Sequence, residues 1–235
     1  TAVALVAAIY LWVQMYTSKL VTREEKNRLL GFIPMFVSGV LFFGIFQQQF
    51  TVMTIYSDVR LDRHMFGWEI PPSLVQSINP IFIVIFSAVF ATMWTKLGDR
   101  QWSTPVKFGV ANIVIGISLF FFLPFSGGEA NSTPMYAIIF ILFLFTMAEL
   151  LLSPVGNALA TKVAPVAFPS RMMAVWMMAV AMGTSLAGSL AGFYTPDDAG
   201  AENTFFISLG VASIVLGGIL LGLSRWVVKK FSTFR

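Results

Sequence analysis

Long apolar runs are the feature that most limits how this chain can fold. Seven of them approach the roughly 20 residues that a helix needs to cross the hydrocarbon layer of a bilayer. They cover residues 2–18, 29–57, 72–95, 107–125, 134–160, 171–194 and 203–228. Only 11% of the residues are charged, against about 25% in an average soluble domain. The sequence therefore predicts an all-α integral membrane protein.

The residue types that are rare in the chain exclude several kinds of site. Cysteine is absent and the single histidine, His64, lies in a loop, so neither a thiolate metal site nor a histidine-rich metal centre is expected. No phosphate-binding glycine loop or pair of acids stands out, and Ser153 has no buried basic partner within any span. An enzyme is therefore not expected, and neither is a bound cofactor.

The loops between the apolar runs carry very unequal numbers of basic residues. The linker 19–28, alternate loops after it and the tail hold thirteen lysines and arginines, whereas the other loops hold two. Basic residues are enriched on the cytoplasmic side of membrane proteins. We therefore expect a multi-pass protein of the cytoplasmic (inner) membrane whose linker and C-terminus are cytoplasmic. The net charge of +4 then follows from topology, and no nucleic-acid partner is expected.

One acid lies inside a predicted span. Glu149 is followed by Ser153 and Asn157 at intervals of four residues, which places a polar stripe on one helix face. Pro154 removes a backbone donor beside that stripe and is expected to bend the helix. Acids within membrane spans usually mark an ion or substrate path. The alternative is a neutral acid that forms a structural hydrogen bond with a neighbouring helix.

Other spans offer polar or aromatic groups at comparable depth. Asn79 precedes Pro80, and Gln47 to Gln49 form a run of three amides. Consecutive residues lie about 100° apart on a helix, so these three glutamines cannot all face one cavity. Trp176 is an aromatic that could line a pocket, although a single tryptophan in a membrane helix is more often a packing residue.

Four segments of the chain, taken together, resemble the proton-coupled oligopeptide transporter family of the major facilitator superfamily. They are FFGIFQQQFTVMTIYSD (42–58), GWEIPPSLVQSINPIFIVIFS (67–87), MAELLLSPVGNALATKVAP (147–165) and FPSRMMAVWMMAVAMGTSLAG (168–188). The resemblance covers about residues 29–228 and concerns only the C-terminal half of that fold. It implies a six-helix C-terminal bundle over residues 29–235. Residues 1–28 would then be an extra helix between the halves with its cytoplasmic linker, and the N-terminal six-helix half would be a missing partner.

The resemblance also implies roles for individual residues. The position of Glu149 contacts the peptide's amino terminus in the family, and that of Asn79 assists. Ser153 would lie beside the glutamate, and Trp176 would line the side-chain pocket. Gln48 stands where many members have an acid, and an amide cannot titrate.

The leading functional hypothesis is proton-coupled symport of di- and tripeptides across the bilayer by alternating access, with protons as the coupling ion. One alternative is a major facilitator carrier for another small solute, such as an anion or a drug. A receptor or scaffold is a third. It would bind a ligand without transporting it.

Overall fold

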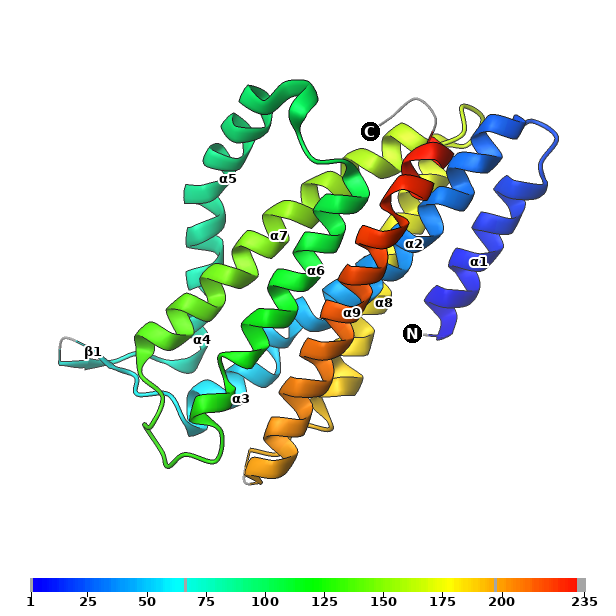
Figure 1. Ribbon diagram of the computed structural model, residues 1–235. Helices are drawn as coiled ribbons and strands as arrows, with labels where there is room; N and C mark the ends of the chain where they lie inside the picture. The colour runs from blue at the N-terminus through cyan, green and yellow to red at the C-terminus, as the bar shows by residue number, and fades with distance from the viewer. Residues whose placement is uncertain (1, 66, 197, 232–235) are drawn as a thin grey trace.

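The computed structural model describes residues 2–65, 67–196 and 198–231, and most of them are helical (Figure 1). The α-helices are α1 (Ala2–Thr17), α2 (Arg23–Phe46), α3 (Val52–Val59), α4 (Pro72–Val75), α5 (Ile78–Leu97), α6 (Thr104–Phe120), α7 (Met135–Val163), α8 (Pro169–Ala191) and α9 (Ala199–Phe231). Three 3₁₀ turns are η1 (Gln47–Phe50), η2 (Gly98–Arg100) and η3 (Leu123–Phe125). The strands β1 (His64–Met65) and β2 (Trp68–Glu69) form a short antiparallel hairpin.

Six helical segments of the described chain are long and apolar enough to cross a membrane. They cover Arg23–Val59, Pro72–Arg100, Thr104–Phe125, Met135–Val163, Pro169–Ala191 and Ala199–Phe231. The predicted class, an all-α multi-pass membrane protein, is confirmed. The first of the seven predicted spans is the shorter α1, with 16 residues.

The start of α2 lies within the predicted linker. Thr22 caps the helix: its hydroxyl accepts a hydrogen bond from the Glu25 backbone N–H at 3.3 Å, and its own backbone N–H donates to the Glu25 carboxylate at 2.7 Å. This reciprocal capping box satisfies two backbone donors that a helix N-terminus otherwise leaves unpaired. The helix therefore begins at Arg23, six residues before the apolar run itself.

Helices α6 and α9 share the most extensive contact of the bundle, and it depends on glycine. A Cβ added at Gly116 would lie 2.7 Å from the carbonyl oxygen of Gly210, and one added at Gly210 would lie 2.9 Å from that of Gly116. Such distances mean that the two backbones are in direct contact. Small residues allow this approach between membrane helices, where dispersion between closely packed surfaces holds helices together.

Helix α5 stands apart from the rest of the bundle in Figure 1 and packs mainly on α7. Asn79 is its one buried residue in the part of the chain that the structure describes. Its exposed face is rich in aliphatic side chains, among them Ile81, Val84, Ile85 and Val89. The face presented by α5 thus suits lipid or another apolar protein surface.

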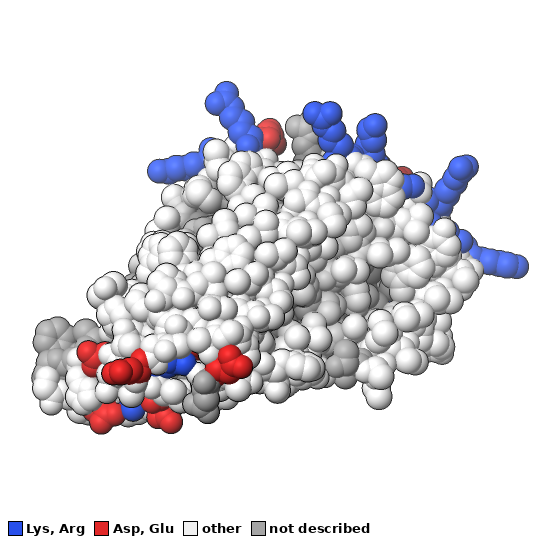
Figure 2. Space-filling view, turned by 60° about the horizontal axis from the view of Figure 1, so that its bottom comes forward, with Lys and Arg blue, Asp and Glu red and all other residues white. Residues whose placement is uncertain are grey.

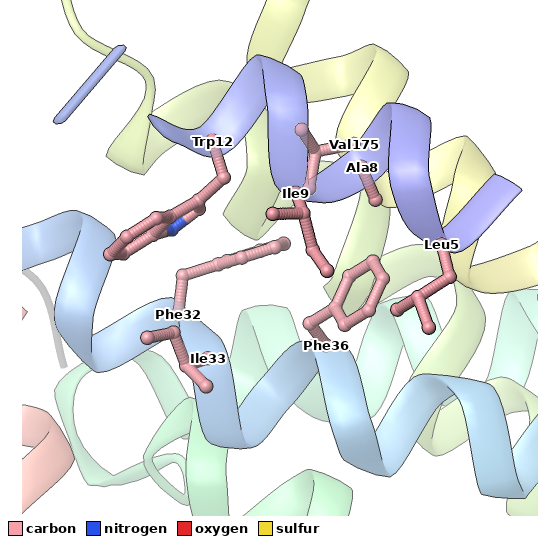
Figure 3. Close-up of a pocket in the computed structure, with 8 residues that line it drawn as sticks. All are labelled: Leu5, Ala8, Ile9, Trp12, Phe32, Ile33, Phe36 and Val175. Atoms are coloured by element: carbon pink, nitrogen blue, oxygen red, sulfur yellow. The ribbon is translucent and has the colours of Figure 1, made fainter. Parts of the chain in front are cut away.

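Helix α1 lies against α8 and α2 (Figure 1). Between these three helices is a pocket of about 200 Å³, lined only by apolar side chains (Figure 3). They are Leu5, Ala8, Ile9, Trp12, Phe32, Ile33, Phe36 and Val175. The contacts of α1 with α2 and α8 therefore cover only part of its apolar face.

Charged residues are segregated to the two ends of the molecule. Figure 2 shows most lysines and arginines along one edge and most of the visible acids gathered on the opposite side. Arg235, one of the thirteen basic residues counted above, lies outside the described residues, and so does Asp197. This separation matches the asymmetry of the sequence.

Glu149 is not the only acid that the helices bury, because α9 begins before the predicted span 203–228 and includes the buried Glu202 in its first turn. Its side chain is fully buried and lies 3.3 Å from Arg60, which is itself buried. Ser126, the backbone N–H of Gly127 and the Tyr194 hydroxyl donate further hydrogen bonds to it, at 2.9, 3.1 and 2.8 Å. Burial raises the pKa of the Tyr194 phenol, which therefore stays a hydrogen-bond donor. This cluster ties three connecting segments together at the acidic end.

Candidate functional site

Glu149 lies midway along α7 and is half-buried. Its Oε2 atom is buried without a hydrogen-bond partner among the described residues, and so is the Oγ atom of Ser153, one turn further on. A buried polar atom without a partner costs about 1–3 kcal/mol. The predicted polar stripe thus contains two oxygen atoms whose hydrogen-bonding capacity the described protein groups leave unused.

Asn79 comes to this stripe from the first turn of α5. Its side-chain amide donates to the Thr146 hydroxyl at 3.0 Å, and it lies close enough to the Glu149 carboxyl to interact with it. Thr146 in turn donates to the carbonyl oxygen of Leu142 at 2.9 Å. Thr146 was not among the residues predicted from the sequence, although it stands three residues before Glu149 and extends the stripe by one turn. Asn79, Thr146 and Glu149 therefore form one polar cluster between α5 and α7.

Pro154 does not interrupt α7, which is helical from Met135 to Val163. Proline has no backbone N–H, so the carbonyl oxygen of Leu150 loses its usual helical partner. This leaves a further acceptor one residue from Glu149. The helix around the stripe is therefore rich in acceptors and poor in donors.

Trp176 is placed in the core, not on the wall of an open pocket. It is 1% exposed. Its ring contacts those of Phe32, Phe43 and Phe108, with centroids 5.9–6.3 Å apart. Its indole N–H donates to the side-chain oxygen of Asn157 at 2.9 Å. In this conformation Trp176 is a packing residue, and Asn157 holds its indole in place.

Gln48 is also buried, and its side chain bonds to groups other than Glu149. Its amide donates to the carbonyl oxygens of Gly44 and Ala187, at 3.1 and 3.3 Å. Its neighbour Gln47 donates to the Thr184 hydroxyl at 3.0 Å. The glutamine run forms the 3₁₀ turn η1, and two of the three amides bond to α8, in line with the expectation that they do not share one cavity. Gln48 thus holds α2 to α8.

The polar cluster has the chemistry of a cation site. Among the described residues no lysine, arginine or histidine forms an ion pair with Glu149, and no group of acids or histidines could hold a metal ion. A carboxylate with a free oxygen can accept two or more hydrogen bonds from an ammonium group. Asn79 can add an amide oxygen as a further acceptor. The apolar pocket beside α1 offers no such group.

Comparison with known proteins gives the context of this site. The family model described as POT family matches residues 2–206. An uncharacterised transporter of Bacillus subtilis, YclF, is 40% identical over 96% of this chain and 45% of its own length. A di-/tripeptide transporter of Lactococcus lactis is 36% identical over 99% of this chain and 48% of its own. The chain thus spans about half the length of the curated relatives it matches.

Solved structures agree with the sequence comparison. A mutant of a peptide transporter POT in complex with alafosfalin superposes with a TM-score of 0.89 at 35% identity, covering 97% of this chain and 47% of that one. A POT family transporter in complex with 5-aminolevulinic acid gives 0.87 at 34% identity, covering 96% and 47%. POT family proteins are transporters, in agreement with the expectation that this chain is not an enzyme. With most of its length matched by the family model and near-complete coverage by two peptide transporter folds, the chain belongs to the POT family.

Proposed function

We propose that the protein containing this chain is a proton-coupled symporter of di- and tripeptides that works by alternating access. Peptide transport is supported by the POT family match and by a similar protein named a di-/tripeptide transporter. The coupling ion in this proposal is the proton, because Glu149, the acid of the polar cluster, can bind either a proton or a cationic group. No cofactor is required.

The observation that carries the proposal is the unpaired Oε2 atom of Glu149 beside Asn79. A peptide's amino terminus is an ammonium group with three donors and no acceptor. It complements a cluster that is rich in acceptors and has no cation paired with its acid. When the peptide leaves, a proton can take the place of the ammonium on the carboxylate. Competition for one carboxylate then links the movement of the peptide to that of the proton.

Ser153 and Gln48 have different places in this scheme. Ser153 lies one turn from Glu149 with its hydroxyl unpaired, so it can donate to a peptide carbonyl group. Gln48 cannot titrate, and its hydrogen bonds to α8 give it a structural role. Proton binding within this chain therefore rests on Glu149. Trp176 can line a side-chain pocket only in a conformation that exposes it.

We propose further that a second six-helix half covers the open side of the site. The curated relatives are about twice as long as this chain, and α5, which carries Asn79, has an extensive exposed apolar face. The polar cluster offers no cation for a peptide's carboxylate, so that end of the peptide is assigned to the second half. In this arrangement residues 29–235 are the C-terminal bundle, and residues 1–28 are an extra helix with its linker.

The basic end of the molecule is assigned to the cytoplasm. The thirteen-to-two distribution of lysines and arginines among alternate loops supports this orientation. The linker after α1 and the end of α9 are then cytoplasmic, and the membrane is the cytoplasmic (inner) membrane. The Arg60–Glu202 cluster lies at the outer end.

A carrier for another small solute is the second candidate. One similar POT family structure holds 5-aminolevulinic acid, which is not a peptide. Such a ligand also has an amino group, so the role of Glu149 would be the same and only the rest of the pocket would differ.

Uptake by the intact protein in liposomes tests the proposal. A proton gradient directed inward should drive accumulation of a labelled dipeptide. Glu149→Gln keeps the size of the side chain but removes its charge. Loss of a hydrogen bond to a charged group costs about 1.5–3 kcal/mol, or roughly ten- to 150-fold in affinity. Uptake should fall accordingly, whereas Glu129→Gln, at an exposed loop residue, should leave it unchanged.

Two results would contradict the proposal. Unchanged uptake by the Glu149→Gln variant would show that Glu149 is not part of the transport site. Accumulation of 5-aminolevulinic acid but of no dipeptide by the unmodified protein would favour the second candidate.

A further inference from the structure

A large cavity lies between α5, η2, α6 and α7. Its volume is about 850 Å³. One part of its wall is apolar and includes Phe90, Leu150 and Leu159. The other part holds the side chains of Lys107, Lys162 and Gln101. The cavity is therefore amphipathic.

Lys107 gives this cavity an unusual charge. The residue is only 6% exposed. Its ammonium donates to the Gln101 side-chain oxygen at 2.6 Å and lies 3.9 Å from the centre of the Trp94 ring. No carboxylate within the described residues forms an ion pair with it. Asp99 also lines the cavity but is exposed to solvent.

A second lysine on the wall of the cavity makes the burial of the Lys107 charge less favourable. Lys162, at the end of α7, is close enough to repel it. Burying a charge without an opposite charge is costly, and buried charges in proteins are normally paired. The ring of Trp94 and the oxygen of Gln101 provide only partial compensation. The cavity thus holds two lysines that form no ion pair with a described carboxylate, which suits a bound anion.

The position of the cavity indicates the source of the anion. It lies next to η2, at the same end of the molecule as the linker after α1 and the end of α9 (Figure 1). This is the end where lysines and arginines gather (Figure 2). Trp94 and Trp102 both line the cavity, and tryptophan is enriched where a membrane meets water. Basic pockets between membrane helices on the cytoplasmic side suit anionic lipid head groups.

We propose that this cavity binds the phosphate group of an anionic phospholipid. The phosphate lies between Lys107 and Lys162, and an acyl chain follows the apolar wall formed by Phe90, Leu150 and Leu159. The indole N–H of Trp94 is buried without a partner among the described residues and supplies one more donor close to Lys107. The lipid would thus pack α5, which has few contacts with the bundle, against α6 and α7.

Lipid binding to the intact, delipidated protein in a neutral detergent tests this assignment. The probes are phosphatidylglycerol, phosphatidylcholine with the same acyl chains, and inorganic phosphate, and the readout is the concentration dependence of the unfolding temperature. Phosphatidylglycerol should bind at least tenfold more tightly than phosphatidylcholine. Lys107→Gln should weaken the binding of phosphatidylglycerol by about tenfold or more, because the substitution removes a charged donor. Lys96→Gln, an exposed lysine in the last turn of α5, should change it by less than about twofold.

A second variant covers the case in which Lys107→Gln does not fold. Ala91→Phe fills the cavity from α5 and leaves both lysines in place. This variant should weaken the binding of phosphatidylglycerol without altering the change in unfolding temperature that inorganic phosphate causes. Unchanged binding of phosphatidylglycerol in either folded variant would overturn the proposal. If inorganic phosphate stabilises the protein as strongly as phosphatidylglycerol does, the two lysines bind a free anion and the lipid proposal is wrong.

Discussion

A single methyl group added at Gly156 should strain the core around Trp176. A Cβ at this position would lie 2.1 Å from Cζ2 of Trp176. Carbon atoms pack at about 3.5 Å, so the ring would have to move by roughly 1.4 Å. The ring has little room, because Gly39 also lies against it, and a Cβ added there would be 2.8 Å from Cζ3. Forcing extra methyl groups into a packed core costs about 1–3 kcal/mol.

The higher helix propensity of alanine partly offsets this packing cost. Alanine is favoured over glycine in a helix by about 1 kcal/mol, so the free energy of unfolding of Gly156→Ala must be compared with that of a matched variant. Gly188→Ala provides it, because Gly188 also lies within a helix and a Cβ there would meet nothing within 4 Å. We expect Gly156→Ala to be about 1–3 kcal/mol less stable than Gly188→Ala.

Thermal unfolding of the intact protein in detergent measures this difference. A double-mutant cycle with Trp176→Phe adds a specific test, because the smaller ring leaves space for the new methyl group. Gly156→Ala should therefore cost much less in the Trp176→Phe background than in the unmodified protein. Equal stabilities of Gly156→Ala and Gly188→Ala would refute the close packing of Gly156 against the Trp176 ring.

The acidic end and the topology give two further predictions. Glu202→Ala leaves Arg60 buried without its acid and should lower the free energy of unfolding by about 3–5 kcal/mol, with the exposed Glu129→Ala as a control near zero. A similar small effect of both changes in a thermal unfolding assay would show that the ion pair stabilises nothing. In a cysteine-free background, Glu129→Cys should react with an impermeant thiol reagent added to intact cells, and Lys229→Cys should not. The reverse labelling pattern would reverse the proposed orientation.

Properties that depend on local sequence could be predicted before the structure was known. Six of the seven apolar runs identify helices long enough to cross a membrane, and the spacing of Glu149, Ser153 and Asn157 places them on one face. Helix ends were less predictable. The capping box at Thr22 starts α2 well before its apolar run, and η1 interrupts the span that was expected to be one helix.

Burial produced by contacts between distant segments could not be predicted in the same way. Trp176 is enclosed by Gly39 and Gly156, which come from two other helices, so nothing near it in the sequence shows that it is a core residue. Glu202 stands just before the predicted span 203–228, and its burial depends on Arg60, which lies far away along the chain. Gln48 is buried because the carbonyl oxygen of Ala187 is within its reach. In all three cases the tertiary partner decides the role.

The role of Glu149 is tested most directly by the binding of a dipeptide and of its N-acetylated form. Both affinities are measured for the intact protein and for Glu149→Gln. The unmodified protein should prefer the free amino group by about tenfold or more, since an ammonium bonded to a carboxylate is lost on acetylation. In Glu149→Gln the ratio of the two affinities should fall close to one. A ratio that survives the substitution undiminished would show that Glu149 does not receive the amino group.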